Sequence, residues 1–258
     1  MKTLLIEKAN AVTTITLNRP DVHNAFNEDL TKELLETFTG LNDDAETRLI
    51  VLTAVGKSFS AGADLNYMKS ASQKSKEQNV TESFIMASML SAIDEVNKPV
   101  LGVVNGAALG GGMGLVSVCD VVVAHEAAQF GFSEVKLGMA PSVISPFVIR
   151  KMGVPQARRY FLTGERFDAA TAVKLNLTHA IYNESNKDEV IQIFIKQFLS
   201  SAPAAMSEIK KLLRANWQLP LESLTQFTAE QISTLRTSSE AGEGIRAFFE
   251  KRKPAFVL

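Results

Sequence analysis

The sequence predicts one α/β domain with a largely helical C-terminal region. Short β-branched and apolar runs alternate with amphipathic segments up to about residue 142. Beyond that point the periodic segments have helical spacing. Apolar strands that alternate with helices are typical of a sheet with helices on both faces.

The first elements are expected to be two strands and a helix. Leu4–Glu7 and Val12–Leu17 are β-type runs separated by a short turn. Pro20 ends the second strand because proline has no backbone N–H for the ladder. Asn27 is expected to cap a helix that runs to about Leu41 and carries apolar residues at helical spacing.

The middle of the chain continues this alternation. Strands are expected at Leu49–Thr53, Val100–Val104 and Val121–Ala124, because each run is short, apolar and rich in β-branched residues. The polar stretch Lys69–Asn79 is interpreted as a mobile connection. A helix from about Thr81 to Val96 follows it.

The remaining segments have helical periodicity and are separated by turn-forming residues. These predicted helices are Pro155–Leu162, Ala169–Lys174, Asp188–Leu199, Ala204–Trp217, Leu221–Leu235 and Gly242–Lys251. A helical C-terminal region of this kind serves as a cap over a site, as an oligomerisation arm, or as both.

Composition excludes several classes of protein. The chain has 258 residues with 27 Lys and Arg against 28 Asp and Glu, which gives a net charge of −1. This balance argues against a dedicated nucleic-acid or acidic-membrane binder. Cys119 is the only cysteine, so an intramolecular disulfide is excluded and a cysteine zinc site is not expected. The three histidines have no metal-ligand spacing, so no metal site is expected.

No segment is interpreted as a targeting or membrane-spanning sequence. The N-terminus has no apolar signal region, so a cytoplasmic protein is expected. The run from Pro99 to Cys119 is uncharged over 21 residues, but glycines interrupt it repeatedly. It is therefore interpreted as a buried strand, a loop and a short helix.

Two glycine-containing loops are candidate binding elements. Ser60–Asp64 and Asn105–Gly112 each lie where a strand gives way to a helix. Backbone N–H groups at a helix start have no partner in the helix, and glycine lets a ligand approach them closely. Two such loops supply an oxyanion hole for a thioester enolate if each gives one N–H. The alternative is that these glycines serve only turns and tight packing.

Taken together, the motifs resemble the enoyl-CoA hydratase/isomerase (crotonase) superfamily. The motifs are Asn18-Arg19-Pro20, His23-Asn24-Ala25, Phe59 to Leu65, Lys98-Pro99-Val100, Asn105 to Gly112, Cys119-Asp120 and Phe130 to Gly138. The resemblance covers nearly the whole chain. It implies an α/β spiral of ββα units in residues 1–200 that encloses an acyl-CoA site. Residues 201–258 are then a helical trimerisation region, commonly in a dimer of trimers.

The resemblance also implies roles for individual residues. The backbone N–H groups of Ala63 and Gly111 match the family's oxyanion donors. The family's coenzyme A contacts fall on Asn24, Ala25, Ala61, Ala63, Asp64 and Leu65. Asp64 is alternatively the cap of the following helix. The basic segment Arg246 to Lys253 is either a contact for a CoA phosphate, in the same or a neighbouring subunit, or a solvated helix end. No separate cofactor is expected, because coenzyme A carries the substrate.

Glutamates at two positions are typical of the hydratases in this family. Glu134, in the pattern F-G-x-x-E, matches one position, but the other falls on Gly114. Hydration needs a proton at the α-carbon and an activated water at the β-carbon. With one carboxyl, Glu134 does both through the water, or another group assists. Its neighbours Phe130, Phe132, Val135 and Leu137 are expected to raise its pKa if they also surround it in space.

The segment after Glu134 lacks the P-G-x-G-G-T ending typical of hydratases. With Gly114 and the segment from Ala157 to Phe167, it resembles bacterial methylglutaconyl-CoA hydratases of leucine breakdown. That resemblance implies hydration of 3-methylglutaconyl-CoA to 3-hydroxy-3-methylglutaryl-CoA. Isohexenylglutaconyl-CoA hydratases are close neighbours. Such a substrate has a distal carboxylate, for which the candidate partners are Ser142, Ser145, Lys136 and Arg150.

Two other functions remain open at this stage. A Δ3,Δ2-enoyl-CoA isomerase needs only one glutamate, because it moves a proton between two carbons. The missing glutamate is also compatible with a weakly catalytic relative that binds acyl-CoA or RNA. The near-zero net charge argues against RNA.

Overall fold

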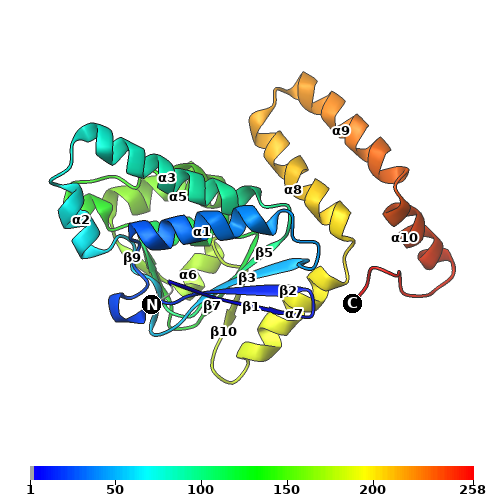
Figure 1. Cartoon of the computed structure of the whole chain (residues 1–258), viewed down its shortest axis with the longest axis horizontal. Coiled ribbons are helices and arrows are strands. Elements are labelled where there is room, and N and C mark those ends of the chain that lie inside the picture. Colours follow the sequence, from blue (N-terminus) through cyan, green and yellow to red (C-terminus); the bar gives the residue numbers. More distant parts are fainter. Residues whose placement is uncertain (1–2) are drawn as a thin grey trace.

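The computed structural model describes residues 3–258 except for the side chain of Leu65, and it contains two sheets (Figure 1). The larger has six strands in the order β1-β2-β3-β5-β7-β10, and the smaller has four in the order β4-β6-β8-β9. The strands are β1 (Leu4–Ala9), β2 (Val12–Leu17), β3 (Leu49–Ala54), β4 (Ser58–Ser60), β5 (Val100–Val104), β6 (Ala107–Leu109), β7 (Val121–His125), β8 (Gln129–Gly131), β9 (Arg166–Asp168) and β10 (Ala180–Tyr182).

The chain winds as a spiral of repeated ββα units. The pairs β3 and β4, β5 and β6, and β7 and β8 each give one strand to each sheet before the chain enters a helix. Only β1–β2 and β8–β9 pair antiparallel among the strands described. The helices are α1 (Glu28–Leu41), α2 (Leu65–Ala71), α3 (Lys76–Glu95), α4 (Gly111–Val118), α5 (Ser145–Thr163), α6 (Ala169–Lys174), α7 (Lys187–Leu199), α8 (Pro203–Gln218), α9 (Leu221–Arg236) and α10 (Ser239–Phe249), with 3₁₀ turns at Pro20–Val22 and Glu134–Leu137. The α/β prediction is confirmed.

The β3 strand shows why a wholly apolar run forms here. Side chains alternate between the two faces of a strand, and both faces of this sheet are covered. Ile50 and Leu52 enter the main core with residues of α1 and α3, whereas Leu49 and Val51 enter a second cluster with Leu199 of α7. Figure 1 shows α1 and α3 on one side of the sheet and α7 on the other.

The predicted start of α1 is confirmed, but the interpretation of Lys69–Asn79 is wrong. Asn27 caps α1, since its side chain accepts a hydrogen bond from the Leu30 N–H. The expected mobile connection is mostly helix, because only residues 72–75 separate α2 from α3. Ser75 and Gln78 form a reciprocal capping box that starts α3 about one turn before the predicted Thr81.

The helix predicted from Pro155 is present, but the helical segment that precedes it was not predicted. α5 starts at Ser145 and consists of two helical segments that meet at Gly153, whose φ of 77° is not helical. Pro155 lies in the first turn of the second segment, where proline is favoured. The run Pro99–Cys119 forms β5, β6 and α4, as predicted. No helix in the described residues is long and apolar enough to span a membrane.

The C-terminal helices α8, α9 and α10 extend from the α/β core as an arm (Figure 1). The predicted division at residues 200/201 falls between α7 and α8. Large apolar side chains of the arm are exposed, and they include Ile209, Leu213, Trp217, Leu221, Ile245, Phe248 and Phe249. Exposed apolar surface of this extent is typical of an interaction site. Trimerisation itself stays a prediction.

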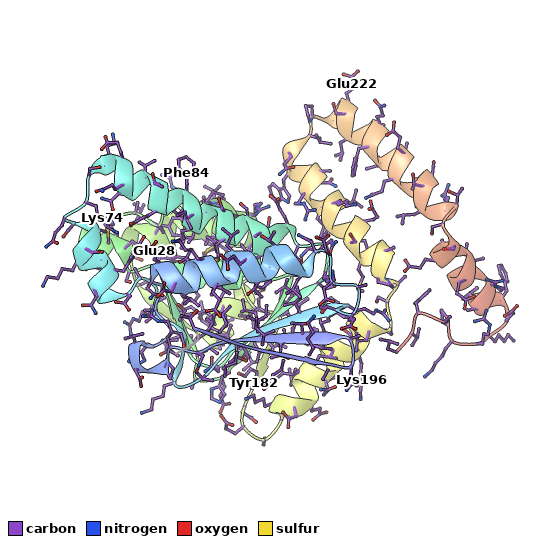
Figure 2. The ribbon with its side chains drawn as sticks, viewed as in Figure 1. Glu28, Lys74, Phe84, Tyr182, Lys196 and Glu222 are labelled. Atoms are coloured by element: carbon purple, nitrogen blue, oxygen red, sulfur yellow. The ribbon has the colours of Figure 1, made fainter. Side chains whose placement is uncertain are left out.

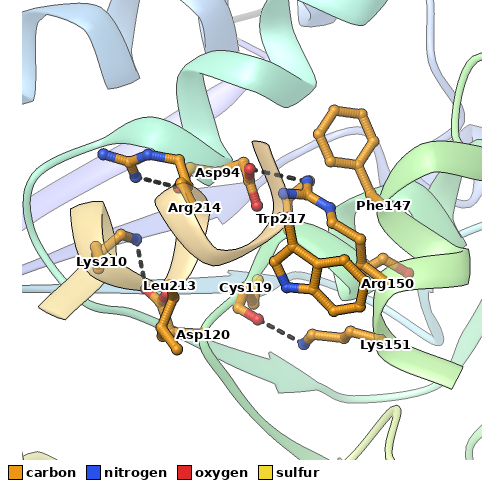
Figure 3. Close-up of a pocket in the computed structure, with 12 residues that line it drawn as sticks. Asp94, Cys119, Asp120, Phe147, Arg150, Lys151, Lys210, Leu213, Arg214 and Trp217 are labelled. Atoms are coloured by element: carbon orange, nitrogen blue, oxygen red, sulfur yellow. Dashed lines mark hydrogen bonds and ion pairs between the residues drawn. The ribbon is translucent and has the colours of Figure 1, made fainter. Parts of the chain in front are cut away.

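Charged side chains attach the base of the arm to the core (Figure 3). The ammonium group of Lys210 in α8 lies 2.6 Å from Asp120, whose carboxylate also accepts from the Val100 N–H at 2.8 Å. Lys151 donates to the Cys119 carbonyl at 2.5 Å, at the end of α4. A cation is favourable at a helix C-terminus because unpaired carbonyls gather there.

The predicted core role of Cys119 agrees with its complete burial, which raises the pKa of its thiol to about 12.

Asp94, near the end of α3, takes part in a second connection at this junction. Its carboxylate pairs with Arg150 of α5 at 2.9 Å within the core, and its backbone carbonyl accepts from Arg214 of α8 at 3.4 Å. These groups surround a cavity of about 220 Å³ between α8 and the core. The cationic side chains that line this cavity therefore already bind carboxylates or backbone carbonyls of this chain.

Replacing Lys210 is expected to weaken the junction. Lys210→Ala removes a buried partner of Asp120, and a loss of about 1–3 kcal/mol in the free energy of unfolding is expected. The lower end of that range reflects the partial exposure of Asp120. Chemical denaturation measures the loss. The neighbouring Lys211→Ala is the control, because Lys211 pairs with Glu208 on the surface. Equal losses in both variants would contradict this account.

Candidate active site

Two loops of the spiral meet closely at one end of the smaller sheet. The first follows β4 and contains Gly62, and the second joins β6 to α4. A side chain at Gly62 would place its Cβ 2.9 Å from the Leu109 carbonyl oxygen and 3.4 Å from the Gly111 nitrogen. Gly62 also has φ at 90°, which disfavours other residues. The contact therefore requires glycine.

Hydrogen bonds to Phe26 orient the Ala63 N–H. Phe26 donates to the Gly62 carbonyl at 2.7 Å and accepts from the Asp64 N–H at 2.9 Å. The Gly62 C=O and the Ala63 N–H belong to one trans peptide, so they point to opposite sides. The Ala63 N–H therefore points away from Phe26, on an exposed residue.

The second predicted donor lies across from Ala63. Gly111 is the first residue of α4, so its N–H has no partner within the helix. Two N–H donors from adjoining loops are what a developing oxyanion requires. The geometry is compatible with the predicted oxyanion hole, whose function stays a prediction.

The Glu134 carboxyl lies over the residue that precedes this donor. Oε1 of Glu134 is 3.1 Å from the position of a Cβ on Gly110, which itself has φ at 49°. The Gly110 N–H donates to the Gly131 carbonyl at 3.0 Å and so ties the loop to β8. Glu134 comes three residues after the last residue of β8 and is the first residue of a 3₁₀ turn. The spiral thus brings the predicted carboxyl and Gly111 together.

Burial raises the pKa of Glu134. Its Oε2 is hidden from solvent and has no hydrogen-bond partner among the residues that the structure describes. Phe130 and Phe132 are completely buried on the strand side, whereas Leu137 is largely exposed. A half-buried carboxyl with no ion pair to any residue from 3 to 258 is suited to taking up and releasing a proton.

Apolar packing leaves no free space for a side chain at Gly114. A Cβ on Gly114 would lie 2.7 Å from the Ile144 Cγ2 and 3.3 Å from the Leu90 methyl groups. These apolar side chains occupy the space that a side chain at this position would need. A glutamate does not fit there without a rearrangement of both neighbours.

The Asn24 side chain links three backbone groups around the turn in which it lies. Its side chain is completely buried, accepts from the Arg19 N–H, and donates to the carbonyls of Val55 and Ser58. The predicted coenzyme A contact of the Asn24–Ala25 segment stays a prediction, and the Asn24 side-chain oxygen and nitrogen already bind backbone groups of this chain. Asn24 maintains a turn in which its own φ is 54°.

Arg19 has a role that the sequence analysis missed. Its guanidinium group donates to the Ala25 carbonyl and pairs with the Asp64 carboxylate at 2.9 Å. Burial opposes ionisation of Asp64, but hydrogen bonds from the Asn66 N–H and Arg19 keep its pKa below the usual value. Asp64 caps α2, as predicted. Arg19 therefore positions the loop that carries Ala63.

The other residues predicted to contact coenzyme A differ in their exposure to solvent. Ala61 and Ala63 are exposed, whereas Ala25 and Asp64 are buried. Leu65 begins α2, and its side chain lies outside the described part of the chain.

The predicted basic segment lies far from this loop. Figure 1 shows α10 at the opposite end of the molecule from α2. Arg246 pairs with Glu243 at 3.2 Å, and Arg252 pairs with Glu243 and Glu250. The segment therefore does not reach the site of its own chain.

The four candidate partners for a distal carboxylate of the substrate differ in whether they already bind other groups of this chain. Arg150 is paired with Asp94 at the base of the arm. The hydroxyl groups of Ser142 and Ser145 donate to nearby carbonyls. Lys136 forms no ion pair within the described residues and is exposed two residues after Glu134.

Comparison with known proteins identifies the family. The model of the family "Enoyl-CoA hydratase/isomerase" matches residues 7–257. The chain belongs to this family. A putative enoyl-CoA hydratase of Thermus thermophilus is 33% identical over 97% of this chain and 99% of its own length. The 2,3-dehydroadipyl-CoA hydratase of Escherichia coli is 30% identical over 99% of both chains.

Solved structures agree with the crotonase-like fold. A structure of an enoyl-CoA hydratase from Shewanella pealeana has a TM-score of 0.93 and 40% sequence identity. The alignment covers 98% of this chain and 95% of that one. The resemblance to the family is therefore confirmed along with the fold.

Adding a methyl group at Gly114 is expected to destabilise the protein. Gly114→Ala should cost about 1–3 kcal/mol in the free energy of unfolding, because the new Cβ would overlap Ile144. Ile144→Ala creates space at the same point. In the double variant the loss should be smaller than the sum of the single losses, as measured by chemical denaturation. Additive losses would show that the two positions do not compete for space.

The raised pKa of Glu134 predicts a pH-dependent gain in stability on its removal. At a pH above the raised pKa, the folded state must ionise a carboxyl in a poorly solvated place, which costs stability. Glu134→Gln should therefore be more stable than the natural protein near neutral pH. The difference in stability should disappear as the pH falls below 4.5, the ordinary pKa of a glutamate. Below that pH the Glu134 carboxyl is protonated in both the folded and the unfolded state. Thermal unfolding across this pH range is the measurement, and a less stable variant at neutral pH would contradict the account.

Proposed function

We propose that this chain hydrates a 2-enoyl-CoA thioester. The observation that carries the proposal is the Glu134 carboxyl over Gly110, next to the Gly111 N–H and across from that of Ala63. A thioester oxygen between the two N–H groups gains stabilisation as an enolate forms, and one such donor is worth roughly 2.7–4 kcal/mol. The conjugated double bond then lies within reach of the carboxyl.

In the proposed mechanism Glu134 moves every proton. The carboxylate takes a proton from water as the water oxygen bonds to the β-carbon, and the electrons of the double bond move onto the thioester oxygen. The protonated carboxyl then donates to the α-carbon as the carbonyl re-forms. The product has gained one water, and Glu134 is again ionised. A raised pKa favours this double task, because the carboxyl must act as base and then as acid.

For the substrate we propose 3-methylglutaconyl-CoA, which would give 3-hydroxy-3-methylglutaryl-CoA in leucine breakdown. The motif resemblance after Glu134 supports this choice. The name of the Escherichia coli relative also refers to an acyl group with a second carboxyl. Lys136 is the exposed cation closest to Glu134 in sequence and is proposed to receive the distal carboxylate. Coenzyme A carries the substrate, and no separate cofactor is proposed.

The second candidate activity is Δ3,Δ2-enoyl-CoA isomerisation. The packing of Ile144 and Leu90 against Gly114 favours it, since a single carboxyl is sufficient to move a proton between two carbons. The two activities differ in their products, because only hydration adds water.

The arm supports a proposal about assembly. Its exposed apolar side chains would be covered by other copies of this chain in a homotrimer or a dimer of trimers. The basic segment Arg246 to Lys253, which is remote from its own site, would then contact coenzyme A only in a neighbouring subunit.

Mass spectrometry of the products tests the activity. The purified protein is incubated separately with 3-methylglutaconyl-CoA, crotonyl-CoA and a 3-enoyl-CoA. Hydration of the first substrate, faster than that of crotonyl-CoA, is expected. Glu134→Gln should lower kcat by roughly 10²–10⁴-fold, because it removes the general acid and base.

Three results would change the proposal. Migration of the double bond without a gain of water would favour the isomerase. Faster hydration of crotonyl-CoA would overturn the branched substrate but retain the hydratase. An unchanged rate in Glu134→Gln would remove this residue from the mechanism.

A further inference from the structure

Phe26 lies beside the loop that carries the Ala63 donor. It is completely buried and directly precedes Asn27, the cap of α1. Figure 2 shows Glu28, the first residue of α1, at the same end of the molecule as Lys74, which follows α2. Because α2 begins two residues after Ala63, the segment of Phe26 and the first donor loop meet at this end.

The main chain of Phe26 holds this first loop in place. Phe26 and Ala63 form a parallel bridge, through the hydrogen bonds of Phe26 to the Gly62 carbonyl and from the Asp64 N–H. Both bonds use the backbone N–H and C=O of Phe26, so a change of its side chain leaves them available. The position of the Ala63 N–H therefore follows the position of Phe26.

The side chain of Phe26 contacts the second donor. Its ring carbons Cδ2 and Cε2 each lie 3.1–3.3 Å from the position of a Cβ on Gly111, so the ring packs against the bare Cα of this residue. The Met86 methyl group lies 3.3 Å from the same position. A methionine side chain is flexible, whereas an aromatic ring keeps its shape. The ring is therefore the rigid part of the contact with Gly111.

Phe26 thus touches both loops that supply the predicted oxyanion hole. An effective donor lies about 2.7–3.1 Å from the oxygen that becomes negative, which leaves little tolerance in its position. A misplacement of about 1 Å lowers a rate by up to roughly 10²-fold. Two donors that must reach one oxygen need a fixed separation, and a residue packed against both loops is placed to fix it.

We propose that Phe26 is a positioning residue that sets the spacing of the two N–H donors. Its main chain holds Ala63, and its ring holds Gly111. The proposal rests on the hydratase function proposed above and adds a residue that acts only through the groups that touch the substrate.

The thioester carbonyl itself reports the spacing of the donors. Butyryl-CoA has no double bond to hydrate, and its carbonyl carbon is labelled with a heavy isotope so that infrared spectroscopy isolates its stretching frequency. Binding to the natural protein should lower this frequency, because two N–H groups polarise the C=O bond. Phe26→Leu removes the ring and should lose about half of this shift or more.

Turnover and ground-state binding provide the second readout. In Phe26→Leu the kcat for hydration should fall by about 10–100-fold, because the donors no longer meet the enolate oxygen together. The Kd of free coenzyme A, which has no carbonyl for the oxyanion hole, should stay within about threefold by calorimetry. If Phe26→Leu does not fold, Phe26→Met replaces it, since a flexible chain fills the space without holding Gly111 rigidly.

Phe38→Leu is the matched control. Phe38 is completely buried in the same core, ten residues beyond Glu28 and so about 15 Å along the axis of α1. The same substitution there should lower the free energy of unfolding in a similar way. It should leave the carbonyl frequency and kcat at the values of the natural protein.

Gly111→Ala tests the contact between the ring and the second donor. The new Cβ would overlap the Phe26 ring, so this variant alone should also lower kcat and the carbonyl shift. Leucine at position 26 leaves room for the methyl group. In the double variant the loss of kcat should therefore be smaller than the product of the two single losses.

Four results would overturn the proposal. They are the absence of a carbonyl shift in the natural protein, an unchanged shift in a folded Phe26→Leu variant, an equal loss of the shift in Phe38→Leu, and independent losses in the double variant. Failure to hydrate any enoyl-CoA would instead remove the hydratase function. The infrared comparison would still decide whether Phe26 positions the donors.

Discussion

The structure depends on backbone segments that approach each other too closely for side chains. A Cβ on Gly112 would lie 2.5 Å from the Ser60 carbonyl oxygen, and one on Gly106 only 2.1 Å from that of Lys57. Each contact lets one turn of the spiral rest directly on the next. The same closeness puts the loop of Gly62 against Gly111, so the stacking of the fold and the pairing of the two N–H donors have one cause. The stacking of the fold and the proposed oxyanion hole therefore depend on the same contacts.

At Glu134, a feature that suits the proposed chemistry lowers the stability of the fold. Its half-buried carboxyl has an oxygen without a partner, which a purely structural residue would rarely keep. The surrounding aromatic core and the hydrogen bond from the Gly110 N–H to β8 hold the carboxyl over the donor loop, although the unpaired oxygen costs stability. A buried oxygen without a partner, located beside two backbone N–H groups, is the physical reason why we propose the reaction at this end of the smaller sheet.

The sequence was sufficient for features that depend on local chemistry and motif order. The Asn27 and Asp64 caps, the buried β3 run and the α/β class are all local or periodic signals, and each is confirmed. The very short strands β4, β6 and β9 carry too few residues for a period, so the second sheet was missed. The tasks of Arg19 and Asn24 depend on contacts between distant segments, which spacing alone does not reveal.

The packing around Gly114 limits which substitutions could add a second acid to this site. Ile144 and Leu90 lie against the position, so a single change to glutamate would place a carboxyl in occupied space. A second carboxyl there would need smaller side chains at neighbouring positions at the same time. Single substitutions are more readily accepted around Glu134, so the proton chemistry of this site is easier to tune than to extend.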